Sequence, residues 1–164
     1  MSVIVDTSVW SLALRRNTAS KKIKVVNILR DLVTDGQVIM LGIIRQEILS
    51  GIRYPEQFIQ LRNYLRAFPD LELIAEDYEL AAEFFNTCRS NGIQGSNTDF
   101  LICAVAHRRS YSILTTDKDF ENFRCYCKKY NVLSYLANPK EGALHFINAP
   151  YWLAKCLHYQ SLLF

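Results

Sequence analysis

Four acidic residues occupy positions where an ordinary solvated charge is unexpected. Asp6 follows the apolar run VIV directly, and Asp117 follows the run ILTT. Glu47 lies inside the otherwise apolar stretch IIRQEILSGI, and Asp99 opens the most apolar helical stretch, TDFLICAVAH. The carboxyl ends of parallel strands share the edge of an open α/β sheet where ligands bind. We therefore expect these four acids to lie close together in the folded chain.

The chemistry that such a cluster supports is the binding of a divalent cation. At separations of ~5 Å, each pair of carboxylates would repel by roughly 3 kcal/mol at an effective dielectric of ~20. Protons or a cation must neutralise this charge. Mg²⁺ and Mn²⁺ prefer carboxylate oxygen and water, and the chain has no His/Cys cluster that would favour zinc. Because metals held by carboxylates alone usually serve phosphate chemistry, the pattern favours cleavage of a phosphodiester.

Each acid also has an ordinary structural interpretation, which stays open at this point. Asp6 suits a loop or a helix cap after the first strand, and the stretch SNTD that ends at Asp99 has the pattern of a capping box. The stretch TDKD has the same pattern. Capping does not explain Glu47, whose alternative is a surface ion pair with Arg45 or Arg53. Such a pair would contribute little to stability.

Alternating apolar runs and helical stripes predict the elements that position these acids. Runs that are apolar on both faces suit buried parallel strands, and stripes at helical spacing indicate helices. The predicted strands span residues 2–5, 38–41, 112–114 and 131–135, and residues 71–75 form a short strand or an extended loop. The predicted helices span residues 22–33, 43–52, 55–68, 77–90, 98–109 and 119–129. This alternation predicts a three-layer α/β domain.

Length and composition restrict the class of protein. The chain has 164 residues, of which 50% are hydrophobic and 21% charged, and this excludes a mainly disordered chain. No stretch approaches the roughly 18–20 consecutive apolar residues that a membrane span needs, and the start MSVIVDTSVW lacks the pattern of a signal peptide. Five cysteines without a C-x-x-C pair favour reduced thiols. We therefore expect a soluble cytoplasmic protein that has no contact with a membrane.

The composition changes near the C-terminus. We expect residues 1–137 to form the α/β domain, since the alternation of strands and helices ends there. Residues 138–164 contain two prolines followed by an aromatic, apolar end. This segment has too much apolar surface to leave in water, so we expect an appendage that packs on the domain or across a dimer interface.

The sequence around the four acids resembles the PIN-domain family and, within it, the VapC-like ribonuclease toxins. The matching stretches are IVDTSVW, EILSGI, DFLICAVA and ILTTDKDF, in this order within residues 1–136. The resemblance implies a PIN-like three-layer α/β/α fold with a central, mainly parallel sheet. It implies an endoribonuclease dependent on Mg²⁺ or Mn²⁺, with Asp6, Glu47, Asp99 and Asp117 as the catalytic, metal-binding acids. The expected reaction is in-line hydrolysis of RNA by an activated water, which leaves a 5′-phosphate and a 3′-hydroxyl.

The resemblance also implies supporting residues and partners. Ser8 and either Thr115 or Thr116 are expected to orient the carboxylates or the attacking water, and Asp119 to help through water or from outside the direct ligands. Asn97 departs from the family pattern, in which another acid is common. Family members are commonly homodimers and bind a small antitoxin that blocks the site. The resemblance therefore implies one half of a toxin–antitoxin pair.

The charge of the chain is compatible with an RNA substrate. The formal charge is +3, and neutralising the four acids would bring it to +7. Arg15, Arg45 and Arg53 are candidate contacts for RNA or for acidic residues of an antitoxin, and a solvated helix face is the alternative for the neighbouring lysines. A second class of function also stays open. A PIN-like module that binds RNA or a protein without cleavage would keep the fold and the basic surface.

Overall fold

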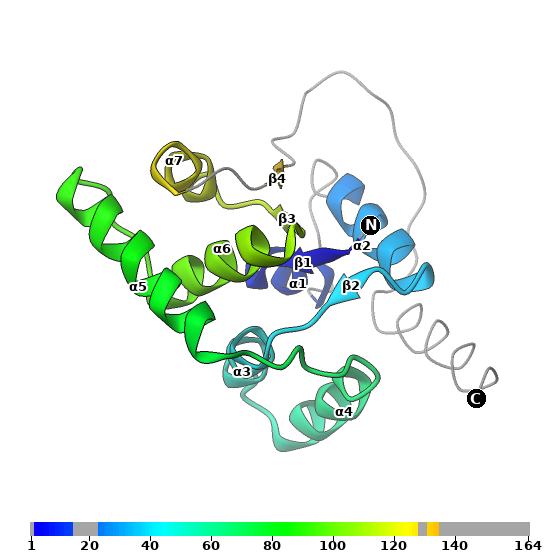
Figure 1. Cartoon of the computed structure of the whole chain (residues 1–164). Helices are drawn as coiled ribbons and strands as arrows, with labels where there is room; N and C mark the ends of the chain where they lie inside the picture. The colour runs from blue at the N-terminus through cyan, green and yellow to red at the C-terminus, as the bar shows by residue number, and fades with distance from the viewer. Residues whose placement is uncertain (1, 15–22, 128–130, 135–164) are drawn as a thin grey trace.

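The structure is a computed structural model of the chain, and it describes residues 2–14, 23–127 and 131–134. The strands are β1 (Val3–Val5), β2 (Val38–Ile39), β3 (Ser112–Thr115) and β4 (Asn131–Ser134). The helices are α1 (Thr7–Leu14), α2 (Ile23–Thr34), α3 (Gly42–Ser50), α4 (Pro55–Leu65), α5 (Ala75–Ser90), α6 (Asn97–Arg109) and α7 (Asp119–Tyr126) (Figure 1). Arg15 and the predicted appendage at residues 138–164 lie outside the described residues.

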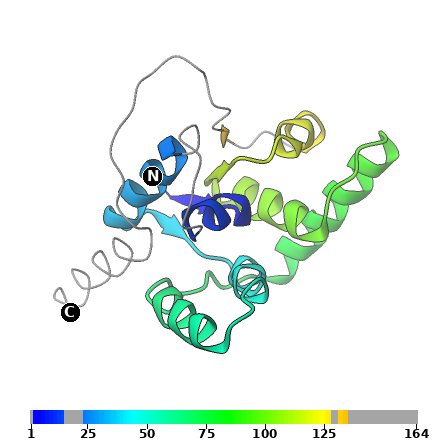
Figure 2. The same ribbon diagram turned by 180° about the vertical axis from the view of Figure 1, so that it is seen from behind.

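The four strands form one parallel sheet in the order β2-β1-β3-β4. In the centre, Ile4 pairs with Ile39 on one side and with Ile113 on the other. Parallel neighbours require crossover connections, and the intervening helices supply them. Helices α5 and α6 lie over one face of the sheet, and α1 and α2 lie over the other (Figures 1 and 2). The structure thus confirms the predicted α/β class and the parallel sheet.

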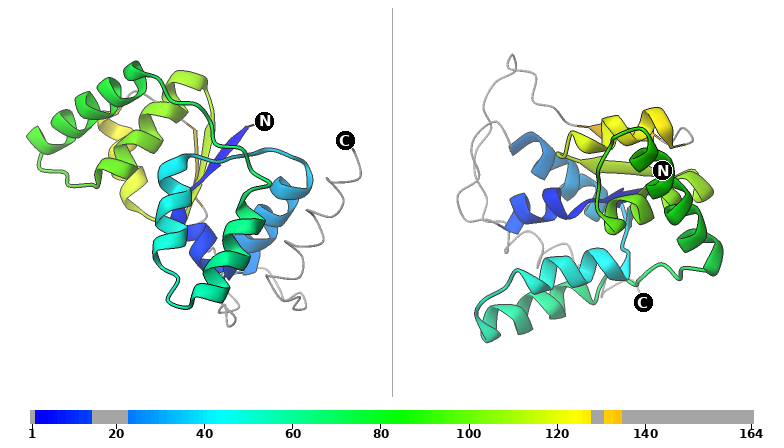
Figure 3. Two further views of the ribbon diagram at one scale, coloured as in Figure 1. Left: turned by 90° about the horizontal axis from the view of Figure 1, so that it is seen from below. Right: turned by 90° about the vertical axis from the view of Figure 1, so that its left-hand side faces the viewer.

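Helices α3 and α4 form a hairpin beside β2 (Figure 3). Arg45 of α3 ties the end of this hairpin together, because its guanidinium binds the Asp70 carboxylate at 2.8–3.1 Å and the main-chain carbonyls of Leu65 and Phe68. The chain after α4 makes one bridge, Met40 with Asp70, and then runs without regular structure to α5. The extended loop is therefore the correct alternative of the two considered for residues 71–75.

The hydrophobic core extends from α1 through the sheet to α6. Residues 100–106 of α6 are all buried, as the apolar sequence of this helix predicts. Phe100 contacts Phe123 of α7 with the ring centroids 4.8 Å apart. A Cβ on Gly95 would lie 2.6 Å from the Phe123 ring, so only glycine fits where the chain passes these rings before α6. On the other side of the sheet, Trp10 of α1 packs edge-on against Phe68.

Helix α1 was not predicted from the sequence. Its eight residues include several β-branched or aromatic side chains, and Val9, Trp10, Leu12 and Ala13 are buried, so no amphipathic stripe marks it. The other predicted elements are present, with ends that shift by a few residues. None of the described helices is long and apolar enough to cross a membrane.

Candidate metal centre

Asp6 lies where β1 passes into α1, and its carboxylate is held by three donors. Its main-chain N–H donates to the carbonyl of Leu114 at 2.9 Å, and its carbonyl accepts the N–H of Val9 at 3.0 Å. Oδ2 accepts hydrogen bonds from the Ser8 hydroxyl at 2.5 Å, the Ser8 N–H at 3.3 Å and the Thr115 hydroxyl at 2.9 Å. Oδ1 receives no hydrogen bond from the described residues. Asp6 is therefore both a helix cap and a fixed carboxylate with one oxygen left to bind a ligand.

The loop after β3 folds onto the same carboxylate. The Thr115 hydroxyl donates to Asp6 and accepts the Asp117 N–H at 2.9 Å. The Thr116 N–H donates to the Ser8 hydroxyl at 3.2 Å, so Thr116 contributes here through its main chain. Asp117 is exposed, and its Oδ1 accepts the N–H of Asp119 at 2.9 Å. The two strand-end acids are thus linked through the Thr115 hydroxyl.

Glu47 reaches this edge from α3. Ile44 and Ile48 of the same helix are buried in the core, which leaves Glu47 exposed beside them. Its Oε2 accepts a hydrogen bond from the hydroxyl of Thr7 at 2.7 Å. Neither of the arginines considered from the sequence, Arg45 and Arg53, makes a hydrogen bond to Glu47 in the part of the chain that the structure describes. Thr7 was not predicted as a site residue, because it lies 40 residues from Glu47.

Asp99 occupies the third position of α6 and completes the predicted capping box. The Ser96 hydroxyl accepts the Asp99 N–H at 3.1 Å, and Asp99 Oδ2 accepts the Ser96 N–H at 2.8 Å. Burial raises the pKa of Asp99, and the negative charges of Asp6 and Asp117 raise it further. The two hydrogen bonds to Ser96 oppose this rise in pKa only in part. Asp99 therefore caps its helix and also shares an electrostatic field with the two strand-end acids.

The donor set at this edge fits a hard divalent cation. Its candidates are carboxylate oxygens, and burial together with the negative charges of Asp6 and Asp117 raises the pKa of Asp99. Among the described residues, no three His, Cys, Asp or Glu side chains are gathered tightly enough to enclose an ion. Mg²⁺ does not require such a cage, because it usually retains several waters and binds one or two carboxylates directly. An all-oxygen set with open positions is the arrangement that this ion uses.

The three candidate arginines differ in their surroundings. Arg15 lies outside the described residues. Arg45 is committed to Asp70 and to main-chain carbonyls, and this gives it a structural role that competes with the predicted contact to RNA or antitoxin. Arg53 is exposed in the turn that follows α3, with its guanidinium 6.0 Å from the ring centre of exposed Tyr54. Of the two described arginines, Arg53 is the one that remains available to a partner.

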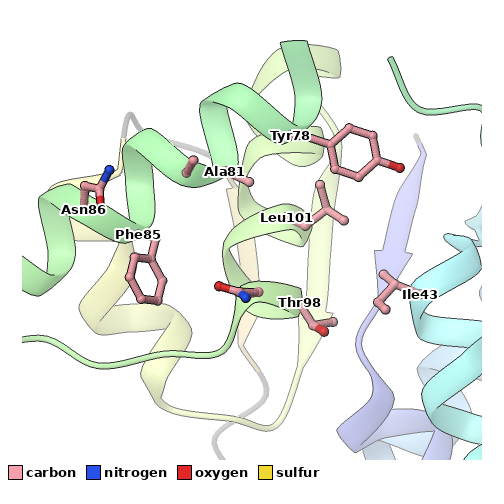
Figure 4. Close-up of a pocket in the computed structure, with 9 residues that line it drawn as sticks. Ile43, Tyr78, Ala81, Phe85, Asn86, Thr98 and Leu101 are labelled. Atoms are coloured by element: carbon pink, nitrogen blue, oxygen red, sulfur yellow. The ribbon is translucent and has the colours of Figure 1, made fainter. Parts of the chain in front are cut away.

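A separate hollow of about 440 Å³ lies between α3, α5 and α6 (Figure 4). Its walls are mainly apolar and include Ile43 of α3, Ala81 and Phe85 of α5, and Leu101 of α6. None of the four acids lines it, and its only ionisable group is the phenol of Tyr78. The hollow therefore has no set of donors for a cation.

Comparisons with known proteins agree with the fold. The family model described as PIN domain matches residues 3–124. Among solved structures, FitAcB from Neisseria gonorrhoeae is similar, with 20% identity, a TM-score of 0.62, and coverage of 79% of this chain and 95% of that one. VapBC2 from Rickettsia felis, bound to a DNA fragment from its promoter, gives 17% identity, a TM-score of 0.65, and coverage of 82% and 99%. FitAB bound to the IR36 DNA fragment gives 19% identity and a TM-score of 0.63, and the match covers 88% of this chain and 99% of that one. A search of curated proteins found no significant match.

Proposed function

The chain belongs to the PIN-domain family, and we propose that it is a divalent-metal-dependent endoribonuclease and the toxin of a toxin–antitoxin pair. The observation that carries the proposal is the linked arrangement of acids at one edge of the sheet. The Thr115 hydroxyl donates to Asp6 and accepts the N–H of Asp117. The negative charges of Asp6 and Asp117 raise the pKa of Asp99. Glu47 accepts a hydrogen bond from Thr7, the residue next to Asp6. This arrangement supports the binding of Mg²⁺ or Mn²⁺ beside a phosphodiester.

In the proposed reaction, the four acids hold the cation and the surrounding hydroxyls hold the acids. When bound, Mg²⁺ or Mn²⁺ would lower the pKa of a water nucleophile and offset charge on the phosphate and the leaving oxygen. Asp6 would present Oδ1, because Ser8 and Thr115 occupy Oδ2. Asp99 would present the oxygen that does not bond to Ser96. No protein nucleophile is needed, and the side chains act by orienting and by holding negative charge in place.

The similar structures support the proposal of a partner. Their names describe two-component complexes, FitAB and VapBC2, that are bound to DNA. We infer that this chain pairs with a small antitoxin that covers the acidic edge, and that it forms a homodimer as related toxins commonly do. Arg53, exposed at the end of the helix that carries Glu47, is our candidate contact for RNA or for an acidic antitoxin residue.

A cleavage assay with the full chain tests the proposed activity. End-labelled structured RNA is incubated with Mg²⁺ or Mn²⁺, with and without EDTA, and the product ends are identified. We expect 5′-phosphate products, no cleavage in EDTA, and a loss of at least about 100-fold for Asp6→Asn, since metal catalysis contributes several kcal/mol. Asp35→Asn is the matched control, because it removes an exposed carboxylate from the turn after α2.

Three outcomes would reject the proposal. Cleavage that survives EDTA, or that survives Asp6→Asn, would exclude a metal-dependent mechanism at this edge. RNA that is retained in a binding assay but never cut, with either metal, would instead favour the alternative of a PIN-like binding module without catalysis.

A further inference from the structure

The hydrogen bond between Thr7 and Glu47 connects two separate parts of the candidate site. Thr7 is the first residue of α1 and follows Asp6 directly, whereas Glu47 lies in the middle of α3. The Thr7 hydroxyl donates to Glu47 Oε2 at 2.7 Å. Within the described residues, this is the only hydrogen bond that the Glu47 carboxylate accepts. The position of this carboxylate relative to Asp6 therefore depends on one neutral hydroxyl.

Glu47 needs such a partner more than the other three acids do. Asp6, Asp99 and Asp117 each accept a main-chain N–H from a residue two or three positions away, so local structure fixes their carboxylates. Glu47 has a longer side chain with more rotatable bonds and projects from a helix whose buried face points elsewhere. Among the described residues, no residue of α3 donates a hydrogen bond to this carboxylate.

We propose that Thr7 is a positioning residue that holds Glu47 at the cation site. This inference rests on the proposed function, because it takes Glu47 as a ligand of the cation or of its waters. The hydrogen bond from Thr7 occupies Oε2 of Glu47 and leaves Oε1 without a hydrogen bond from the described residues. In the same way, Ser8 and Thr115 donate to Oδ2 of Asp6 and leave its Oδ1 free of them. Hydrogen bonds from partners outside the direct ligands orient those ligands and are worth 10- to 100-fold in metal affinity in well-studied sites.

The substitutions that test the role of Thr7 separate the hydroxyl from the shape of the side chain. Thr7→Val keeps the β-branched shape and removes the donor, whereas Thr7→Ser keeps the donor and removes a methyl group. Thr98→Val is the matched control, because Thr98 stands beside Asp99 and makes no hydrogen bond to any of the four acids within the described residues. Chemical denaturation in EDTA establishes that each variant folds before it is compared.

Isothermal titration of the metal-free full chain with Mn²⁺ gives the decisive comparison. We expect Thr7→Val to weaken Mn²⁺ binding about tenfold, and Thr7→Ser and Thr98→Val to stay within about twofold of the unmodified chain. Glu47→Gln should also weaken binding, and adding Thr7→Val to Glu47→Gln should cause no further loss. That lack of additivity is a readout that a purely structural role for Thr7 would not produce.

The outcomes distinguish the role of Thr7 from the proposed function. Unchanged Mn²⁺ affinity in Thr7→Val overturns the positioning role. So does a loss of affinity that is as large when Thr7→Val is added to Glu47→Gln as when it is made alone. In either case, RNA cleavage by the unmodified chain still supports the proposed function. The expected coupling without any RNA cleavage supports the positioning role and counts against the ribonuclease. An unmodified chain that binds no Mn²⁺ overturns both.

Discussion

At the scale of single residues, structural and functional interpretations of an acid are not exclusive. The carboxylate of Asp6 accepts the Ser8 N–H as a helix cap, and the carboxylate of Asp99 completes a capping box with Ser96. Each of these carboxylates uses one oxygen for its cap and keeps the other free of hydrogen bonds from the described residues. Capping thus fixes the direction of a carboxylate at little cost, and the free oxygen can bind a ligand.

Removing the charge of Asp99 should stabilise the metal-free chain. Burial together with repulsion from Asp6 and Asp117 raises the pKa of Asp99, so its ionised form is less favourable in the folded than in the unfolded chain. We expect Asp99→Asn, measured by urea denaturation in EDTA at neutral pH, to raise the free energy of unfolding by about 0.5–2 kcal/mol, as the relief of unfavourable charge usually does.

The stability difference between Asp99→Asn and the unmodified chain should depend on pH and on bound Mn²⁺, and both dependences can be measured. The gain in the free energy of unfolding from Asp99→Asn should be smallest at acidic pH, where Asp99 is protonated in both the folded and the unfolded chain. It should grow as the pH rises through the pKa of Asp99 in the folded chain. Saturating Mn²⁺ should stabilise the unmodified chain more than the variant. A variant less stable than the unmodified chain at neutral pH would show that the capping contact outweighs the repulsion.

Sequence reasoning named the four acids as candidates but did not identify the Thr7 hydroxyl, which donates a hydrogen bond to Glu47. Asp6 and Asp117 were recognisable because each follows an apolar run directly, and adjacency in sequence places them at strand ends. The hydrogen bonds that connect them to Ser8 and Thr115 are short-range or follow from strand pairing. The bond from Thr7 to Glu47 depends on how α3 packs beside α1, and no local pattern records that packing.

At the scale of elements, α5 and α6 are held together by a buried charge cluster at one end of the pair. The Asp77 carboxylate is fully buried and binds Arg108 at 2.6 Å and Arg109 at 2.7 and 2.9 Å. Burial alone would raise the pKa of Asp77, but hydrogen bonds from Arg109, the Ile74 N–H and Arg108 together lower it to about 2. The cluster therefore depends on an ionised carboxylate.

We expect Asp77→Asn to lower the free energy of unfolding by about 2–3 kcal/mol at neutral pH, because two arginines lose a buried charged acceptor. The arginines are partly exposed, which limits the loss. Since the folded pKa lies below the ordinary value of 3.8, the contribution is complete above that value and is lost as the pH falls toward about 2.

Denaturation midpoints of Asp77→Asn and the unmodified chain, compared from neutral to acidic pH, measure this contribution. The difference between them should shrink as the pH falls from about 4 toward 2. Mn²⁺ affinity serves as the control and should not change, because the described partners of Asp77 do not include any of the four acids. A difference that stays constant over this range would contradict the assigned role of the ionised carboxylate.

Helix and strand patterns predicted most elements, and the exceptions have physical causes. Helix α1 carries no amphipathic stripe, because it is covered on most sides and four of its eight residues are buried. The predicted second strand is longer than β2, because the ladder with β1 ends at Ile39. In both cases tertiary packing, rather than local sequence preference, sets the boundary.

At the scale of the whole molecule, the fold gathers negative charge at one edge of a mildly basic chain. The central pairing of β1 with β3 places Asp6 beside the loop that carries Asp117, and α3 and α6 bring Glu47 and Asp99 from more distant parts of the chain. The alternation of strands and helices predicted the first of these associations. The strand order and the packing of α3 were not predictable, because they depend on contacts between residues far apart in sequence.

The most direct test of a cation site at this edge of the sheet is anomalous diffraction from crystals of the full chain soaked in Mn²⁺. We expect at least one manganese peak at this edge of the sheet, within ~2.2 Å of carboxylate oxygens from two or more of Asp6, Glu47, Asp99 and Asp117. The peak should disappear in crystals of Asp6→Asn. Manganese bound only elsewhere on the molecule, or none at this edge under saturating Mn²⁺, would contradict a cation site formed by these acids.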